Sequence, residues 1–149
     1  MTEEEAWAAV SAAHTGILTT LRRDGMPVST PVWFVVIDRR IYTRTRANSK
    51  KVARARRDDR ATFLVEAGLR WAELRAVHLS GRVTLIDEDV PVVAAVEAEL
   101  KRKYDGFTTA REAMPQPTRD HYSVAKTYLC FEAEGRILSW DNRRLGLAT

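Results

Sequence analysis

The sequence predicts a mainly β protein: a closed or nearly closed antiparallel barrel of six or seven strands, with flanking helices. Two observations predict this class. Segments rich in valine, threonine, isoleucine and aromatic residues recur along the chain, and short turns join neighbouring ones. Helical patterns are few, whereas a doubly wound parallel sheet needs a helix after nearly every strand. The length of 149 residues predicts a single domain spanning residues 1–149.

The first part of the chain reads as a helix followed by a hairpin. Thr2 and Glu5 have the spacing of a capping box, which predicts a helix over residues 2–13. The first strand ends at the turn sequence Asp24-Gly25, a strong hairpin signal. The second strand contains Pro31, and an interior proline marks a sheet edge, a bulge or the approach of a ligand. The seven predicted strands are Thr15 to Leu21, Val28 to Ile37, Ile41 to Arg46, Arg60 to Ala67, Trp71 to Asp87 (bent near Gly81), Val124 to Ala133 and Arg136 to Trp140.

Two further helices are predicted between the strands. Asn48 or Ser49 is placed to cap a short helix that runs through Arg56. A second helix is expected from about Glu88 to Tyr104, with Pro91 in its first turn. The stretch 105–120, which holds one glycine and two prolines, is expected to be mostly loop.

Composition narrows the class of protein. Hydrophobic residues make up 45% and charged residues 30% of the chain, values typical of a globular fold. Cys130 is the single cysteine, so an internal disulfide is impossible, and burial as a small hydrophobe is its expected role. The acidic N-terminal sequence is unlike a secretory signal, and we expect a cytoplasmic protein with no membrane partner.

Most well-known catalytic arrangements are absent from the sequence. The histidines His14, His78 and His121 are far apart and share no metal-ligand spacing, so no metal site is predicted. The Gly-rich phosphate loops and the GxSxG motif are also missing. A net charge of +4 is too weak by itself to indicate a nucleic-acid protein, although cations cluster between residues 44 and 60.

One combination of weak signals points to a cofactor. Ser49-Lys50-Lys51 opens a predicted helix, and a helix N-terminus with free N–H groups, a hydroxyl and two ammonium groups suits a phosphate. The strand from Val28 to Trp33 offers small polar groups and an irregularity against which a flat heterocycle can lie. Trp71 and Arg75 add an aromatic ring and another cation. Ordinary helix capping is the alternative interpretation of the Ser-Lys-Lys sequence.

Taken together, in this order along the chain, these signals are more specific than any one of them alone. The run from Gly16 to Asp87 resembles the pyridoxamine-phosphate-oxidase-like split β-barrels. Within that group it is most similar to the flavin/deazaflavin oxidoreductases. The tail 136–141 also looks like that of actinobacterial members. The motifs that carry the resemblance are Leu18-Thr19-Thr20-Leu21, Asp24-Gly25, Pro27-Val28-Ser29-Thr30-Pro31-Val32-Trp33, Thr43-Arg44-Thr45, Ser49-Lys50-Lys51 and Arg60-Ala61-Thr62.

The resemblance implies a split β-barrel of the FMN-binding type that forms a homodimer with cofactors at the subunit interface. It implies that Trp71 and Arg75 flank the phosphate or an anionic tail, and that Trp140 closes the site from the partner chain. It names no catalytic residue. The remaining implied cofactor-binding residues are Ser49, Lys50 and Lys51 at the phosphate, Ser29, Thr30, Pro31 and Val32 along the ring system, and Thr43, Arg44 and Thr45 beside it.

The resemblance also bears on the cofactor. The end of the chain does not match the Arg-rich substrate motif of true pyridoxamine phosphate oxidases. Relatives of this length more often resemble binders of the deazaflavin coenzyme F-420, whose polyglutamate tail suits the surplus of cations. We therefore expect an F-420-dependent oxidoreductase acting on a small molecule. The alternatives are an FMN-dependent oxidoreductase, a non-catalytic cofactor-binding protein and a basic nucleic-acid module, and an extended stripe of cations with stacking aromatics would favour the last.

Overall fold

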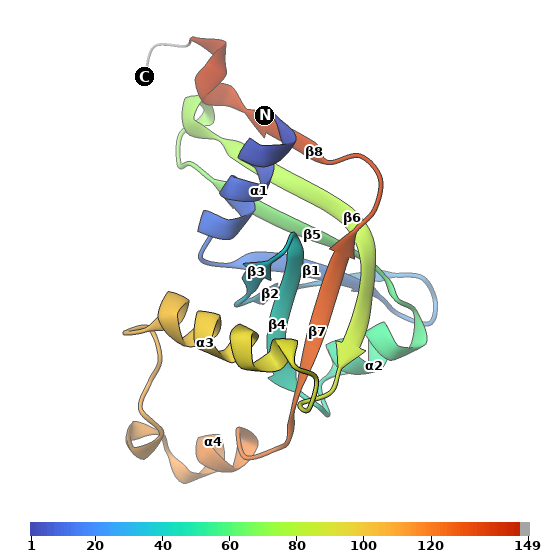
Figure 1. Cartoon of the computed structure of the whole chain (residues 1–149), viewed down its shortest axis with the longest axis vertical. Coiled ribbons are helices and arrows are strands. Elements are labelled where there is room, and N and C mark those ends of the chain that lie inside the picture. Colours follow the sequence, from blue (N-terminus) through green and yellow to red (C-terminus); the bar gives the residue numbers. More distant parts are fainter. Residues whose placement is uncertain (147–149) are drawn as a thin grey trace.

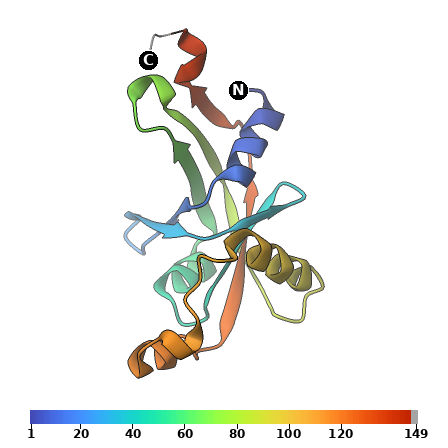
Figure 2. The ribbon, with the colours of Figure 1, turned by 90° about the vertical axis from the view of Figure 1, so that its left-hand side faces the viewer.

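One antiparallel sheet dominates the structure, a computed structural model that describes residues 1–146. Eight strands follow the order β2-β1-β5-β6-β7-β4-β3, with β8 paired to β6, and the sheet curls into a half-barrel (Figures 1 and 2). The predicted split-barrel class is confirmed. The strands are β1 Gly16–Leu21, β2 Pro27–Val32, β3 Val35–Ile37, β4 Arg40–Arg46, β5 Arg60–Ala67, β6 Arg75–Ile86, β7 Lys126–Ala133 and β8 Leu138–Asp141.

The structure has one strand more than expected because the predicted strand from Val28 to Ile37 divides. Its two parts, β2 and β3, lie at opposite edges of the sheet. At the break, the backbone of Phe34 pairs with a side chain instead of a strand. The Tyr104 hydroxyl lies 2.8 Å from the Phe34 N–H and 3.0 Å from its carbonyl oxygen. A tertiary contact with a residue 70 positions away thus ends the strand.

Strand β6 connects the two ends of the molecule. From Arg75 to His78 it pairs with β8, and from Gly81 onward it pairs with β7. The bend predicted near Gly81 lies at this change of partner, and the strand is visibly curved in Figure 1. A Cβ at this position would overlap the backbone carbonyl of Glu132, so only glycine permits the close approach of β7.

The helices are α1 Glu3–Ala12, α2 Lys50–Arg57, α3 Val92–Tyr104 and α4 Gln116–His121. The capping box of Thr2 and Glu5 is present as predicted. Helix α3 begins later than predicted because Pro91 occupies its N-cap instead of its first turn. The expected loop at 105–120 contains a 3₁₀ turn and all but the last residue of α4. None of these helices, within residues 1–146, is long and apolar enough to cross a membrane.

The two sides of the sheet are covered differently. On the concave side, α1 and α2 enclose a core that includes Leu18, Phe63 and Phe131. On the convex side, α3 packs against β3, β4 and β7 around Tyr42 and Tyr128. Neither core includes the convex-side residues of β1, β5 and β8. That part of the convex face therefore carries no helix in the described chain and keeps its side chains accessible.

Candidate functional site

Three polar groups meet where strand β4 leads into helix α2. The hydroxyl of Thr45 donates to the hydroxyl of Ser49 at 3.4 Å, and the ammonium group of Lys51 lies 3.5 Å from the same Thr45 oxygen. Ser49 occupies the N-cap position, as predicted, but its side chain makes no capping hydrogen bond. Its hydroxyl therefore keeps capacity for a ligand.

Backbone donors are available at the same place. Within residues 1–146, the N–H groups of Lys50, Lys51 and Val52 make no backbone hydrogen bond, since the first bond of the helix runs from the Ala53 N–H to the Ser49 carbonyl. Unpaired N–H groups and the helix dipole give this end of α2 a partial positive charge. An anion such as a phosphate is the ligand that this geometry favours.

The side-chain charges also favour an anion at the start of α2. Burial, and then the neighbouring Arg54 and Arg46, lower the pKa of Lys51. Burial and Arg57 likewise lower the pKa of Arg54. In the part of the chain that the structure describes, no carboxylate forms an ion pair with Lys50, Lys51 or Arg54. An incoming anion would relieve this accumulation of positive charge.

Arg54 also belongs to this cluster; the sequence offers it as one of the surplus cations that suit an anionic tail, but not as one of the motif residues. Its Nε donates to the hydroxyl of Thr20 at 2.8 Å, and Thr20 is almost completely buried. The signal that identifies it is helical spacing, because Arg54 follows Lys50 by four residues and so lies on the same side of α2.

The four predicted residues of β2 alternate between the two sides of the sheet. Thr30 and Val32 face the concave side, and Ser29 and Pro31 face the convex side, where the Ser29 hydroxyl lies 2.8 Å from that of Thr19. Because β2 is an edge strand, Pro31 interrupts no ladder on its outer side, and its missing N–H needs no ligand to explain it.

The three predicted residues of β4 also divide. Thr43 and Thr45 face the concave side, and the buried Thr43 hydroxyl donates to the Trp33 carbonyl at 2.7 Å. Arg44 faces the convex side, where it forms an ion pair with Glu97 of α3 at 2.7 Å. Arg44 is thus separated from Lys51 by the sheet, and its predicted cofactor contact stays a prediction.

Trp71, Arg75 and Trp140 lie at the other end of the β5–β6 hairpin. About seven strand residues separate this end from α2, a span of roughly 20 Å. Arg75 pairs in register with Asp141, and Ala76 with Trp140, so Arg75 faces the concave side and Trp140 the convex side. Within a single chain these three residues do not join the cluster at α2.

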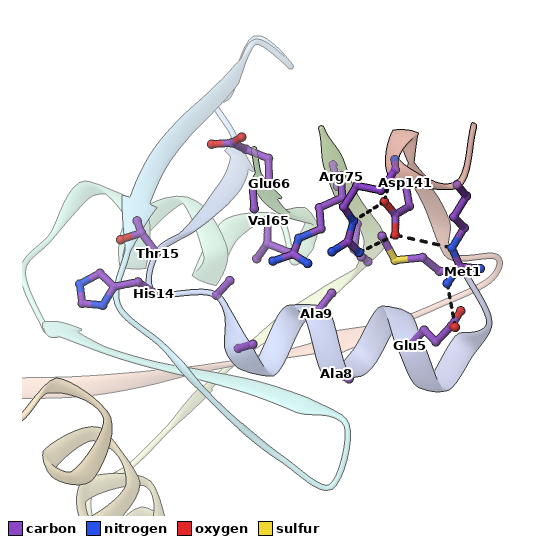
Figure 3. Close-up of a pocket in the computed structure, with 17 residues that line it drawn as sticks. Met1, Glu5, Ala8, Ala9, His14, Thr15, Val65, Glu66, Arg75 and Asp141 are labelled. Atoms are coloured by element: carbon purple, nitrogen blue, oxygen red, sulfur yellow. Dashed lines mark hydrogen bonds and ion pairs between the residues drawn. The ribbon is translucent and has the colours of Figure 1, made fainter. Parts of the chain in front are cut away.

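A cavity lies beside this second group of residues. It has a volume of about 670 Å³ and separates α1 from the concave side of β5 and β6 (Figure 3). At its mouth Arg143 and Arg144 bind Asp141, at 2.6 and 3.5 Å, and Arg144 also binds Glu5 at 2.7 Å. Of the residues around this cavity, the sequence predicted a binding role for Arg75 alone.

Groups suited to other chemistry are not assembled. Within residues 1–146, no set of three His, Cys, Asp or Glu side chains is placed to hold a metal ion. Cys130 is buried, as the sequence predicts, and burial raises the pKa of its thiol, which disfavours the reactive thiolate. The structure therefore adds no catalytic side chain to the binding groups described above.

Comparisons with known proteins agree with this fold. A conserved hypothetical protein of Mycobacterium tuberculosis, Rv2991, is 33% identical, with 100% of this chain and 90% of that chain covered and a TM-score of 0.82. An FAD-binding protein from Mesorhizobium loti (15% identity, 93% of each chain, TM-score 0.70) and an F420 reductase (17% identity, 88% and 94%, TM-score 0.63) share the fold. No curated protein matches.

The family comparison covers most of the chain. Residues 2–126 match the model of the pyridoxamine 5'-phosphate oxidase family. This segment includes β1 to β6 and the whole β4–α2 junction, so the candidate phosphate site lies inside the matched region. The chain belongs to the pyridoxamine 5'-phosphate oxidase family, in the split-barrel group expected from its sequence motifs.

Proposed function

We propose that the protein is an oxidoreductase that uses the reduced deazaflavin coenzyme F-420 to transfer hydride to a small-molecule acceptor. The observation that carries the proposal is the cluster at the start of α2, where unpaired cations and free N–H groups surround a concave-side threonine. A phosphate is the part of a flavin-type cofactor that these donors suit.

The residues of this chain bind and orient the cofactor, which itself supplies the hydride. Lys51, Ser49 and the first N–H groups of α2 hold the phosphate. Thr30, the partly exposed concave-side residue of β2, lies along the ring system, whereas Val32 is buried in the hydrophobic core. The proton that completes the reduction comes from solvent, in keeping with the lack of an obvious general acid among the described residues.

The surplus of cations favours F-420 over FMN. One phosphate neutralises at most two positive charges, whereas Lys50, Lys51, Arg54 and Arg57 all lie on α2, and no carboxylate pairs with any of them in the described chain. The polyglutamate tail of F-420 supplies the additional negative charges. FMN, which carries a single phosphate, is the alternative cofactor, and a non-catalytic carrier of either cofactor is the second alternative.

We propose that the active form is a homodimer. The convex side of β2, β1, β5, β6 and β8 presents few charges, and Leu138 and Trp140 are about half exposed there. Interface cores are poor in charged residues and rich in aromatic ones. Association of two copies through this face would bury the ring of Trp140 at the interface.

A binding titration tests the cofactor proposal. Purified protein is titrated with F-420, with FMN and with the deazaflavin riboside that lacks the phosphate, and ligand fluorescence is followed. We expect F-420 to bind most tightly and the riboside to lose most of the affinity. Tighter binding of FMN would transfer the proposal to the alternative cofactor, and binding of neither would refute the site.

Two further measurements complete the test. Turnover of an electrophilic acceptor by reduced F-420, followed by the return of the oxidised chromophore, separates an enzyme from a carrier. Binding of duplex DNA at 50 and 200 mM salt tests the nucleic-acid reading, because contacts to six to ten phosphates predict a loss of roughly 10³–10⁵ in affinity. Such a loss together with no cofactor binding would overturn the proposal.

A further inference from the structure

The cavity beneath α1 is distinct from the cluster at α2. Its volume of about 670 Å³ lies within the range of small-molecule sites. Figure 3 places its long dimension along α1, from His14 and Thr15 at one end to Met1 and Asp141 at the other. The ten residues of α1 span about 15 Å, so an elongated molecule can lie beside the helix.

The ion pairs around this cavity leave one guanidinium without a partner among the described residues. Asp141 and Glu5 are each engaged by Arg143 or Arg144, so these four side chains form a neutral network at the mouth. The guanidinium groups hold the pKa of the Asp141 carboxyl well below its usual range, which keeps this network charged and paired.

Arg75 and Glu66 are the charged side chains of the lining that lie outside this network. The side chain of Arg75 extends from β6 toward α1, whereas the carboxylate of Glu66 is directed away from the helix (Figure 3). Within residues 1–146 the guanidinium of Arg75 forms no ion pair and no side-chain hydrogen bond, and the residue as a whole is partly buried. A guanidinium without a partner on a partly buried residue favours a bound anion.

The walls near Arg75 are apolar. Ala9 and Ala12 line the cavity from α1, and Val65 and Val77 line it from the sheet. Alanine side chains end at Cβ, so the helix leaves space that a larger residue would fill. The cavity thus combines one planar cation with an apolar trough.

We propose that this cavity binds an amphipathic monocarboxylate, such as a medium-chain fatty acid. The carboxylate pairs with Arg75, and the hydrocarbon lies along α1 between the alanines and the valines. A monoanion matches the single guanidinium of Arg75, which the paired network leaves without a partner among the described residues. Within a single chain this cavity is separate from the cluster at α2, because Arg75 and Lys51 belong to opposite ends of the β5–β6 hairpin.

Calorimetric titration of the whole protein tests this, with decanoate and 1-decanol as probes below their aggregation limits. We expect one decanoate per chain and at least tenfold weaker binding of decanol, because the charge-assisted hydrogen bonds to Arg75 are lost. Arg75→Met should lower decanoate affinity at least tenfold and leave decanol binding unchanged.

Two variants serve as controls. Ala12→Trp fills the trough and should weaken both probes. Arg23→Met removes an arginine from the exposed β1–β2 turn and should change neither affinity. Equal binding of decanoate and decanol by the wild type, or full affinity in either Arg75→Met or Ala12→Trp, would overturn the proposal, as would no binding at all. The comparison of the two probes on the wild type decides the matter even if a variant fails to fold.

Discussion

The two ends of strand β6 carry similar numbers of cations but use them differently. At the α1 end, Arg143 and Arg144 are paired with Asp141 and Glu5. At the α2 end, Lys50 and Lys51 have no acidic partner in the part of the chain that the structure describes. The pairing of the charges, rather than their density, therefore distinguishes a structural network from a candidate anion site.

The nearest acidic residues explain why the α2 cations stay unpaired. Asp58 and Asp59 directly follow the helix, but Asp58 binds Arg60 at 2.7 Å and Asp59 binds Arg82 at 2.7 Å. The hydrogen bonds and charge of Arg60 lower the pKa of Asp58 to about 2. The strands β5 and β6 thus take the two carboxylates that could have neutralised α2.

The largest effect is expected on the free energy of unfolding, at Gly81, where β6 changes its pairing partner between the two ends of the molecule. Gly81→Ala places a Cβ against the carbonyl of Glu132 and should separate β6 from β7. We expect a loss of about 3 kcal/mol in the free energy of unfolding. Denaturant unfolding measures it, with Gly25→Ala, at a turn whose Cβ meets nothing but has a positive φ, as the milder comparison. An unchanged denaturation midpoint for Gly81→Ala would contradict the close approach of β7 to β6 at this position.

The second prediction compares a lysine that has no acidic partner among the described residues with an arginine of the paired network. Lys51→Ala removes a charge-assisted hydrogen bond worth about 1.5–3 kcal/mol and should lower cofactor affinity roughly ten- to hundredfold. Arg144→Ala removes a cation of the paired network and should leave cofactor affinity nearly unchanged. Fluorescence titration of both variants measures this. Equal losses in the two variants would mean that the phosphate is held elsewhere.

A smaller effect concerns Lys103, a partly buried cation that has no acidic partner within residues 1–146. The Lys103 ammonium donates to the Phe34 carbonyl at 2.9 Å, and burial lowers its pKa to about 8. Between pH 8 and the usual lysine pKa near 10.4, the unfolded chain binds more protons than the folded one. This group therefore makes stability rise with pH in that window.

Comparison with Lys103→Met isolates this contribution. The difference in unfolding free energy between wild type and variant should shift toward the wild type from pH 8 to 10.5, by less than about 1 kcal/mol because the residue is only partly buried. Tyrosine titration is common to both proteins and cancels. A difference that does not vary with pH would place the amine in solvent.

The smallest effect on stability is expected for Pro31→Ala, which changes an edge strand. Unfolding free energy should stay within about 0.5 kcal/mol. Cofactor affinity should fall, because the strand beside the ring loses its fixed φ. Titration and light scattering on the same variant test this. Normal binding with faster aggregation would instead assign Pro31 to protection of the sheet edge.

Local rules explain what the sequence predicted well. The capping box at Thr2, the Asp24-Gly25 turn, the bend at Gly81 and the position of Ser49 before α2 all depend on residues that are neighbours along the chain. The split-barrel class follows from the succession of such elements and from motifs within Gly16 to Asp87. Nearby residues constrain φ and ψ directly, so these features are readable without a fold.

The composition of the site was less predictable. Strand alternation assigns Thr43 and Thr45 to one side and Arg44 to the other, but only the structure says which side faces α2 and which faces α3. Arg44 is drawn to Glu97, a residue 53 positions away. No local pattern encodes such a contact.

The sequence by itself thus determined the strands, the turns and the concentration of cations at the start of α2. The tertiary structure decided which of those cations remain unpaired, where β2 ends and β3 begins, and that a cavity with Arg75 lies beneath α1. The physical reason is distance along the chain. The break at Phe34 depends on Tyr104, and the network beside Arg75 joins Glu5 to Arg144, residues that meet only after the sheet has curled.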